Sequence, residues 1–303
     1  MKKNILITGV AGFIGSKVAQ KFINENYNVI GVDDLSNGKK KNIPKGIKFI
    51  KADLSSKNIF SLLPKKCFKI LHLAGQSSGE MSFDNPVSDL NKNTISTLNL
   101  IKYGIEKKVK LFLYASSMSV YGESSKKKLS ENDPCNPLSC YGAGKLAAEK
   151  YLKIFSKSLP FLSLRMFNVY GPGQDMGNLK QGMVSIYLAQ ALKKKTIIVK
   201  GSLKRVRDFI FIDDVVEAWF QASLLKKGLN QSINLGSGKP VSVKHLLKII
   251  IRKIDQTKIK VDKETKGDQF YVCSNNNLYQ KLLKKKKFIS LDKGLEKFIA
   301  SLT

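Results

Sequence analysis

The segment NILITGVAGFIG, residues 4–15, decides the fold class of this 303-residue chain. An apolar run typical of a short buried strand leads directly into Gly9, Gly12 and Gly15, and an amphipathic pattern typical of a helix begins among these glycines. In such a turn the first glycine permits a tight bend, the second lets the backbone approach a pyrophosphate, and the third lets the helix pack on the strand. The segment therefore predicts a strand, a phosphate-binding turn and a helix.

An acidic residue follows at the distance that a dinucleotide site requires. Asp33 closes the second predicted strand, residues 28–32, and stands 18 residues after Gly15. A carboxylate in this position is typical of one that binds the ribose diol of an adenosine, and it repels a 2′-phosphate. The sequence therefore predicts NAD rather than NADP. Asp53, after a third strand, either contacts the adenine or caps a helix with its side chain.

Strands and helices continue to alternate over the first half of the chain, and after Gly171 the pattern loosens into glycine-rich turns. The alternation predicts an α/β protein: a Rossmann-type doubly wound parallel sheet with a smaller C-terminal α/β domain. We expect a NAD-binding domain at residues 1–170, with return segments near 208–236, and a substrate-binding domain at residues 171–303. Strands are predicted at residues 4–8, 28–32, 47–50, 70–73, 110–115 and 161–164, and helices at 13–26, 94–106 and 141–157.

The chain is strongly basic, with 53 Lys and Arg against 23 Asp and Glu and a net charge of +30. Clustered cations would favour a nucleic-acid or membrane surface, because they neutralise phosphates. The lysines are instead scattered, and Arg is rare. Since proteins that read nucleic acids favour the bidentate fork of Arg, the composition argues against nucleic acid as a partner and indicates a solvated, lysine-rich surface.

The four cysteines have neither a metal-ligand spacing nor the pattern of a disulfide framework, so we expect no metal site and a reducing compartment. Asn4, Thr8 and Gly9 interrupt the N-terminal apolar stretch, which therefore does not predict a signal peptide. No segment approaches the length of apolar sequence that spans a bilayer. These features predict a cytoplasmic protein without membrane insertion.

Two polar positions predict a proton-transfer site. Tyr141 and Lys145 lie four residues apart on a predicted helix, so both project from one face. An ammonium at about 4 Å contributes roughly 4 kcal/mol at an effective dielectric near 20, which corresponds to about three pKa units before desolvation is discounted. We therefore expect Lys145 to lower the pKa of Tyr141. Ser116 and Ser117 follow the strand at residues 110–115 and would line the same edge of the sheet.

Together these motifs resemble the extended short-chain dehydrogenase/reductase family, specifically its NAD-dependent nucleotide-sugar epimerase/dehydratase group. The resemblance runs from residue 1 to about residue 240 and continues weakly to Thr303. It rests on TGVAGFIG at residues 8–15, DDLSNG at 33–38, HLAG at 72–75, SSMSVYG at 116–122, YxxxK at 141–145, RMFNVYGP at 165–172 and RDF at 207–209.

The resemblance implies a role for each matching residue. Tyr141 would be the catalytic base, Lys145 would hold the nicotinamide ribose, and Ser117 would hydrogen-bond the reacting sugar hydroxyl. Asn168 would face the sugar diphosphate, and Arg207 would bind one of its phosphates. A bound NAD is also implied, with contacts expected from Gly9, Gly12, Phe13, Ile14, Gly15, Asp33, Asp53, Leu54, Tyr141 and Lys145.

The residues after Ser117 decide between the reactions of this group. Dehydratases of the family carry an Asp-Glu pair there and decarboxylases a Glu, whereas this chain has Met118, Ser119 and Val120. None of these exchanges a proton as a carboxyl does. The resemblance therefore implies epimerisation of a nucleotide-diphosphate sugar at C4 through a 4-keto intermediate. A net 4-keto reductase or another epimerase of the group is the enzymatic alternative, and a non-catalytic RNA-binding member is the alternative from another class.

Two late positions bear on the substrate. The family often places an Arg three residues before the Asp of a Gly-Asp pair, but Thr265 stands there before Asp268, and Lys266 would substitute as a point charge. Four residues after Asp268, Val272 would border the C2 substituent of the sugar. Its small side chain would admit an N-acetyl group.

The resemblance also implies a homodimer with a four-helix interface. The helices near residues 94–106 and 141–157 would form it. Its apolar faces would come from Leu98, Ile101, Ile105, Leu146, Leu152 and Phe155.

Overall fold

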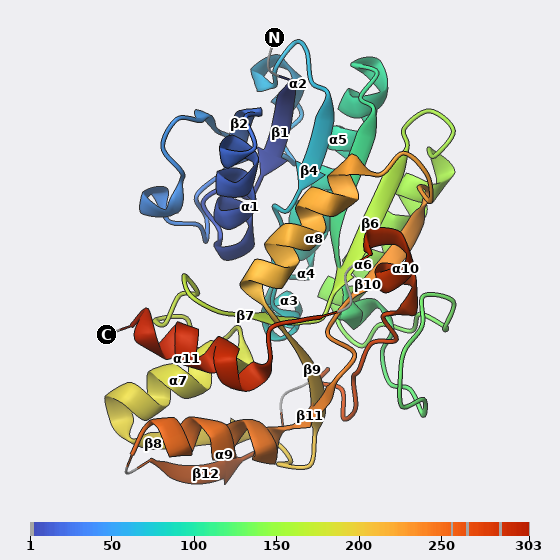
Figure 1. The fold of residues 1–303 in the computed structure, drawn as a ribbon. Coiled ribbons are helices and arrows are strands. Elements are labelled where there is room, and N and C mark those ends of the chain that lie inside the picture. Colours follow the sequence, from blue (N-terminus) through green and yellow to red (C-terminus); the bar gives the residue numbers. More distant parts are fainter. Residues whose placement is uncertain (1–2, 256, 265–266, 285–286, 303) are drawn as a thin grey trace.

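The computed structural model describes residues 3–255, 257–264, 267–284 and 287–302. Its centre is a seven-stranded sheet in the order β10-β6-β5-β4-β1-β2-β3, and every neighbouring pair runs parallel (Figure 1). This confirms the doubly wound Rossmann-type sheet. The strands are β1 (Asn4–Thr8), β2 (Asn28–Asp33), β3 (Lys48–Lys51), β4 (Lys69–His72), β5 (Leu111–Ser117), β6 (Phe161–Met166) and β10 (Gln231–Leu235).

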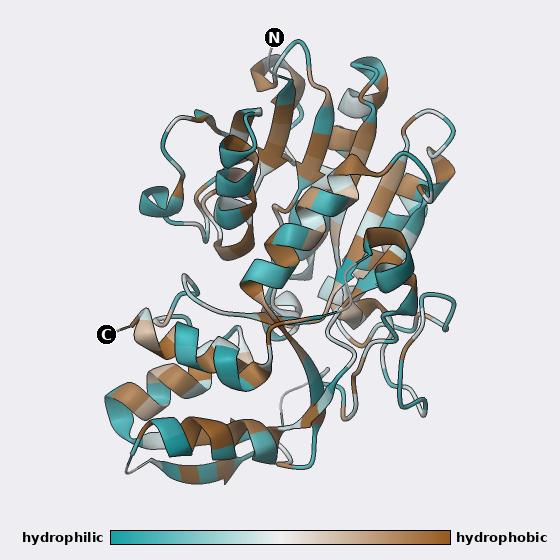
Figure 2. Cartoon of the chain, viewed as in Figure 1, coloured by the Kyte–Doolittle hydropathy of each residue, from teal (hydrophilic) through white to brown (hydrophobic). Residues whose placement is uncertain are grey.

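Helices cover both faces of this sheet. Val18, Ala19 and Phe22 of α1 lie on one helical face and pack with Ile5 and Ile7 of β1 in one core cluster. Figure 2 shows how apolar residues concentrate on the central strands, while the outer faces of the covering helices are hydrophilic. The first face is covered by α1 (Phe13–Asn24), α8 (Ile212–Leu224) and α10 (Asn277–Leu283), and the second by α2 (Ile59–Leu62), α5 (Ser96–Glu106) and α6 (Cys140–Ile154).

The helical segment before β5 starts earlier than the sequence predicts. The helix expected at residues 94–106 is preceded by α3 (Gly79–Asp84), α4 (Pro86–Leu90) and a π-helical turn, η2 (Asn91–Ile95). Asn85 caps α4 by accepting a hydrogen bond from the Ser88 N–H at 3.0 Å, and proline at the first helical position suits this start. Single π-helical turns are often found at functional sites.

A smaller unit lies below the main sheet in Figure 1. Its strands form a three-stranded mixed sheet, β11-β9-β7, and a parallel pair, β12-β8. Helices α7, α9 and α11 share one apolar core cluster with β7, β8, β9 and β11, whereas β12 is exposed throughout. The elements are β7 (Asn168–Tyr170), α7 (Met183–Lys194), β8 (Thr196–Lys200), β9 (Val206–Phe211), β11 (Pro240–Ser242), α9 (Val243–Lys253), β12 (Lys258–Asp262) and α11 (Leu291–Ala300).

Segments from the second half of the chain return to the main sheet. β10 pairs with β6 as the edge strand, and α8 and α10 pack on the same face as α1. The sequence analysis expects a return near residues 208–236, whereas α10 lies beyond that range. Within the described residues, no helix is long and apolar enough to cross a membrane.

Candidate active site

A groove of about 780 Å³ runs along the carboxyl edge of the main sheet, where β1 to β5 end. The order of strands reverses between β1 and β4, and ligands of open α/β sheets bind at such a reversal. The groove wall includes each residue predicted to hold the dinucleotide: Gly9, Gly12, Phe13, Ile14, Gly15, Asp33, Asp53, Leu54, Tyr141 and Lys145.

The glycine turn has the shape and the donors that a pyrophosphate needs. Gly9 has a φ of +73°, and a Cβ there would lie 2.8 Å from the backbone nitrogen of Ala74, so only glycine fits. A Cβ on Gly15 would overlap the Gly9 carbonyl. Gly12 is open by comparison, because a Cβ there would meet the Gly9 oxygen alone, at 3.2 Å. No side chain caps α1, so its first N–H groups remain available to an anion.

Asp33 is fixed by the backbone on both sides. Its Oδ2 accepts a hydrogen bond from the Ala11 N–H at 3.0 Å, and its Oδ1 accepts one from the Leu35 N–H at 2.8 Å. Burial raises the pKa of Asp33. Because a carboxylate oxygen can accept more than one hydrogen bond, the side chain can still bind a ribose diol. The residues of the groove therefore fit NAD.

Lys92 is a groove residue that the sequence analysis missed. Its ammonium pairs with Asp34 and lies 3.0 Å from Asp53 Oδ2. Asp53 Oδ1 meanwhile accepts hydrogen bonds from the N–H and the hydroxyl of Ser55. Asp53 thus caps a turn rather than a helix, because the next helix starts at Ile59.

Tyr141 and Lys145 lie on the groove wall, and the Ser117 side chain hydrogen-bonds Tyr141 from outside the described wall. Ser139 caps α6 by accepting a hydrogen bond from the Gly142 N–H at 3.1 Å, which places Tyr141 in the first turn. Lys145 follows one turn later, with Nζ 5.7 Å from the ring centroid of Tyr141 and 5.0 Å from that of Tyr114. Ser117 is the last residue of β5.

The electrostatics of this trio correct the prediction made from sequence. Burial raises the pKa of Tyr141 to about 12, with the Ser117 hydroxyl acting in the opposite direction. Burial also lowers the pKa of Lys145 to about 8, with Asp89 acting in the opposite direction. The net shift is therefore opposite to the one expected from sequence: the Lys145 ammonium lies 5.7 Å from the ring centroid, and the desolvation of the phenolate outweighs any favourable effect of that charge.

Ser116 belongs to a different network. Its hydroxyl donates to Glu149, which also binds Arg165 through Nε–Oε1 at 3.0 Å and Nη2–Oε2 at 2.7 Å. Arg165 Nη1 further donates to the Tyr121 hydroxyl at 2.9 Å. Arg165 thus binds Glu149 bidentately and joins β6 to α6 inside the protein.

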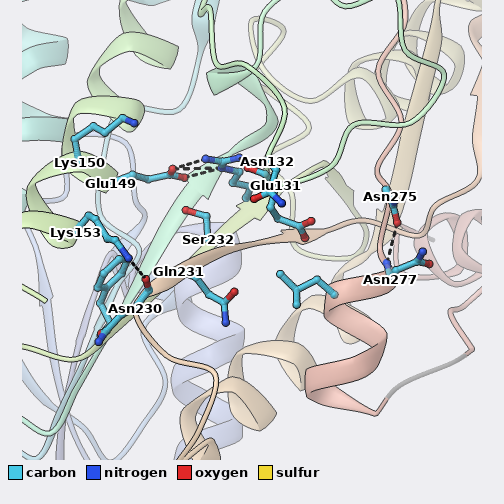
Figure 3. Close-up of a pocket in the computed structure, with 13 residues that line it drawn as sticks. Glu131, Asn132, Glu149, Lys150, Lys153, Asn230, Gln231, Ser232, Asn275 and Asn277 are labelled. Carbon is cyan, nitrogen blue, oxygen red and sulfur yellow. Dashed lines mark hydrogen bonds and ion pairs between the residues drawn. The ribbon is translucent and has the colours of Figure 1, made fainter.

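The Glu149–Arg165 pair borders a second cavity of about 650 Å³ at the β6–β10 edge (Figure 3). Amide side chains and two lysines line most of it, and the Lys153 ammonium donates to the Asn230 carbonyl at 3.1 Å. None of the described residues predicted for catalysis, cofactor or substrate lies on its wall.

The predicted substrate residues lie in different surroundings. The Asn168 amide donates to the Asp208 carbonyl at 3.2 Å and contacts the sulfur of Met118 at 3.5 Å, close behind Ser117. Val272 is fully buried in a core cluster with Val120, so its side chain has no exposed surface that could border a sugar. Like Ser117, Asn168 and Arg207, it is not among the described residues of the groove wall. Lys266 lies outside the described residues.

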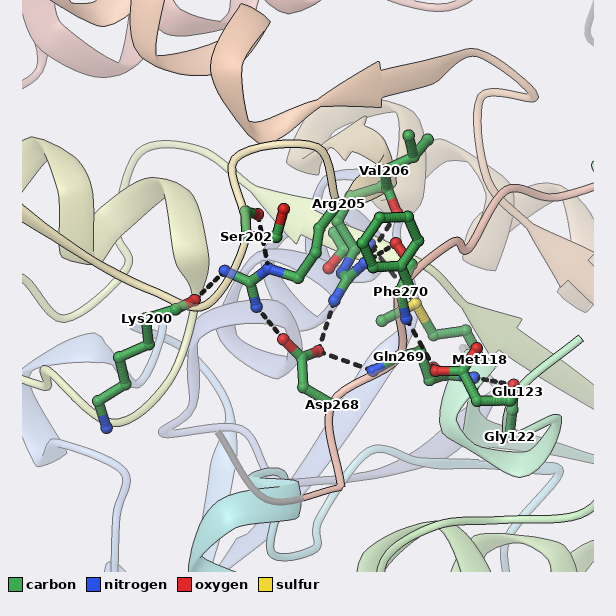
Figure 4. Close-up of polar contacts among 12 residues, drawn as sticks. Met118, Gly122, Glu123, Lys200, Ser202, Arg205, Val206, Asp268, Gln269 and Phe270 are labelled. Carbon is green, nitrogen blue, oxygen red and sulfur yellow. Dashed lines mark hydrogen bonds and ion pairs between the residues drawn. The ribbon is translucent and has the colours of Figure 1, made fainter. Parts of the chain in front are cut away.

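Arg207 is engaged by a carboxylate. It pairs with Asp268, and the same carboxylate pairs with Arg205 on its other side (Figure 4). Arg205 Nε also donates to the Ser202 carbonyl at 3.1 Å. The sequence did not single out Arg205, although Arg is rare in this lysine-rich chain and that rarity could have drawn attention to it.

A dinucleotide groove lined by a Tyr–Lys pair, with a strand-end serine beside the tyrosine, defines the extended short-chain dehydrogenase/reductase class. The chain belongs to the NAD-dependent epimerase/dehydratase family, whose model matches residues 5–236. It is therefore an enzyme of this family, and NAD is its cofactor.

Named relatives share most of the chain. A putative UDP-glucose 4-epimerase of Methanocaldococcus jannaschii is 37% identical over 257 residues, which are 82% of this chain and 82% of that protein. The structure of UDP-glucose 4-epimerase from Thermotoga maritima with UDP-glucose matches with a TM-score of 0.92 and 33% identity, covering 99% and 98% of the two chains. The UDP-glucose 4-epimerase of Thermus thermophilus in complex with NAD matches with a TM-score of 0.88 and 28% identity, covering 98% of each chain.

Proposed function

We propose that the protein is a nucleotide-sugar 4-epimerase that acts through a 4-keto sugar. The observation that carries the proposal is the turn after Ser117. In this turn, Met118–Val120, Ser119 donates its N–H to the Ser117 hydroxyl at 3.1 Å, and no residue has a carboxyl group. An elimination needs an acid or base there, whereas epimerisation at C4 needs the Tyr141 phenol alone for proton exchange.

The three polar residues divide the work. Tyr141 takes the proton of the sugar 4-hydroxyl and later returns it to the 4-keto oxygen. Lys145, with a pKa of about 8, is protonated at neutral pH and stabilises the tyrosinate. Ser117 hydrogen-bonds the reacting hydroxyl and holds it within reach of Tyr141. When bound, NAD supplies a hydride acceptor that returns the hydride to the opposite face of the sugar.

A cationic cluster supports a diphosphate-bearing substrate. Arg205 and Arg207 share the Asp268 carboxylate, so two guanidiniums face one anionic group. Guanidiniums favour bidentate binding of phosphate oxygens. The relative from Thermotoga maritima was solved with UDP-glucose. We assign the diphosphate to Arg207, with Arg205 as its neighbour, and the sugar side to Asn168.

We also propose a homodimer through α5 and α6, with a corrected set of residues. Ile101 and Leu152 are buried in the core of the same chain and cannot reach a partner. Tyr151, Ile154 and Phe155 are instead exposed at the end of α6, and Ile154 is exposed by 69%.

The cellular setting is also a proposal. All four cysteines are free thiols, which supports the expected cytoplasmic setting.

Product analysis in heavy water tests the reaction. The protein is incubated separately with UDP-glucose, UDP-N-acetylglucosamine, UDP-glucuronate and GDP-mannose in D2O, and products are identified by NMR. We expect the 4-epimer of at least one sugar, with no deuterium on carbon, because the hydride returns without exchange. Deuterium at C5, loss of carbon dioxide or net consumption of NADH would instead show a dehydratase, a decarboxylase or a reductase.

The non-catalytic RNA-binding alternative makes a different prediction. Such a protein would leave each sugar unchanged and would bind RNA in a manner that weakens steeply with salt. A filter-binding series at two salt concentrations, run beside the NMR assay, separates the two functions.

A further inference from the structure

A buried carboxylate lies beside the proposed catalytic residues and has no role assigned so far. Asp89 is on α4, is 1% exposed and belongs to the groove wall. Its Oδ1 accepts a hydrogen bond from the Asn93 amide at 3.1 Å, while its buried Oδ2 has no hydrogen-bond partner among the residues that the structure describes. Burying a charged oxygen without a partner is costly, so the position needs a compensating charge.

The compensating charge is on the facing helix. A Cβ on Gly144 would lie 3.4 Å from Asp89 Oδ2, so this oxygen rests against α6 one residue before Lys145. A Cβ on Gly75 would lie 3.2 Å from the Lys145 ammonium and 2.5 Å from Asn93 Oδ1, which also lacks a donor. One ammonium with three donors and two unpartnered acceptors thus gather in a buried space between α4, η2 and α6.

Other ionisable groups around Lys145 do not offer this charge. From β4, His72 is buried and neutral, because burial lowers its pKa to about 3. From β5, the Tyr114 phenol lies near the ammonium, but burial raises its pKa well above 10. On α6, burial raises the Tyr141 pKa to about 12, and Glu149 is committed to Arg165.

The helices beside α4 add no further candidate. From α3, Glu80 pairs with Lys200 and Asp84 is exposed to solvent. From η2, Lys92 pairs with Asp34 and Asp53.

We propose that Asp89 is a positioning residue that keeps Lys145 protonated and directed at Tyr141. The inference rests on the proposed function, in which Lys145 must carry its charge to stabilise the tyrosinate. Asp89 touches neither the sugar nor the reacting atoms and acts through Lys145. Burial raises the pKa of Asp89 and lowers the pKa of Lys145, and in each case the charge of the other side chain acts in the opposite direction.

Direct titration of Lys145 tests the proposal. The protein is prepared with 13C-labelled lysine, and the Lys145 signal is assigned by its loss in Lys145→Arg. This signal should titrate near pH 8, which separates it from surface lysines that titrate near pH 10.4. Asp89→Asn should lower the Lys145 pKa by about 1 unit. The reason is that a nearby opposite charge favours the charged ammonium, and removing that charge shifts its pKa by roughly this amount. Asp84→Asn, an exposed carboxylate on the neighbouring α3, is the matched control and should leave it unchanged. An unchanged Lys145 pKa in Asp89→Asn overturns the proposal.

A reciprocal measurement covers the case in which Asp89→Asn does not fold. Linkage requires that Lys145→Met raise the Asp89 pKa by the same amount as Asp89→Asn lowers that of Lys145. The Asp89 carboxyl carbon, followed by NMR in the parent and in Lys145→Met, reports it. An Asp89 pKa that does not move contradicts the proposal independently of the first variant.

The pH dependence of activity connects the charge to catalysis. In Asp89→Asn, the alkaline limb of kcat should move to lower pH with little change in KM, and Asp89→Glu should restore the parent profile. A purely structural role would lower activity equally at all pH values. The NMR titrations need neither NAD nor sugar, so they measure the Asp89–Lys145 coupling independently of the product assay. A failed product assay would therefore reject the proposed function without rejecting the coupling, and unchanged pKa values would reject the coupling without rejecting the proposed function.

Discussion

At the scale of single residues, the Tyr141 phenol is the group on which turnover depends. Tyr141→Phe keeps the ring beneath Lys145 and removes the oxygen that exchanges the proton, so we expect kcat to fall by a factor on the order of 10² to 10⁴. NAD should remain bound, as measured by cofactor released on denaturation. Tyr151→Phe, on the exposed side of the same helix, is the control and should retain parent activity. Near-parental turnover in Tyr141→Phe would contradict the assignment of the base.

Asp33 governs the choice of cofactor. Asp33→Asn keeps an oxygen acceptor at this position but removes the charge that repels a 2′-phosphate. We expect the preference for NAD over NADP to narrow by roughly tenfold, about 1.4 kcal/mol, in calorimetric titrations. Asp84→Asn, an exposed carboxylate on α3 that is not among the described residues of the groove wall, serves as the control and should leave the preference unchanged. Equal binding of NAD and NADP by the parent protein would show that Asp33 has no such role.

The positions that sequence brought together on one groove are those whose motif carries local geometry, and the features it missed depend on partners distant in sequence. The glycine turn, Tyr141 and Lys145 were placed on the groove because spacing along one turn or one helix fixes their directions. The direction of the Tyr141 pKa shift was predicted wrongly, because burial cannot be read from spacing. Asp89 carried no local signal, since its importance comes from the approach of α6.

At the scale of elements, a buried hydrogen-bond chain ties β1 to β4 and α5. Thr8 Oγ1 accepts from the Leu73 and Ala74 N–H groups, so its own hydrogen is left for His72 Nδ1 at 2.8 Å. His72 Nε2 must then carry the ring proton and donate to Thr97 at 3.0 Å. The chain of donors fixes the neutral form of His72.

This arrangement predicts sensitivity to acid. Burial lowers the His72 pKa to about 3, so the native state stays neutral where the unfolded chain binds a proton near pH 6.5. The stability that His72 contributes is present above pH 6.5 and is lost as the pH falls toward 3, by about 2 kcal/mol between pH 6.5 and 4.5. Urea unfolding should therefore show a smaller acid-induced loss in His72→Gln than in the parent. The exposed His245→Gln should behave like the parent, and an equal loss in all three proteins would contradict the prediction.

The elements of the main sheet were predicted closely, and those of the smaller unit were not. Each predicted strand ends within two residues of its observed bounds, because buried parallel strands read as short apolar runs. The helix expected at residues 13–26 ends earlier, since Asn26 takes a left-handed conformation with a φ of 61°. The pairing of β12 with β8 joins segments about 60 residues apart, and neither sequence pattern signals the other.

At the scale of the whole molecule, the exposed apolar stripe on α6 predicts the assembly. Ile154→Lys should convert the expected dimer to a monomer, because a charge at the centre of an apolar contact must be desolvated. Light scattering after gel filtration measures the mass. Leu62→Lys is the control. Leu62 is an apolar residue on α2 with 52% of its surface exposed, and its substitution should leave the dimer intact. A parent protein that is monomeric at micromolar concentration would contradict the prediction.

The late return of the chain to its main sheet affects how the protein is synthesised. β6 is complete at Met166, but its neighbour β10 begins only at Gln231, and α10 closes the same core from residue 277. A ribosome adding roughly 5–20 residues per second needs on the order of seconds to cover that interval. During this time the β6 edge offers unpaired backbone groups to other nascent chains. The nascent polypeptide is therefore most exposed to misassembly, and most in need of a chaperone, in the middle of its translation.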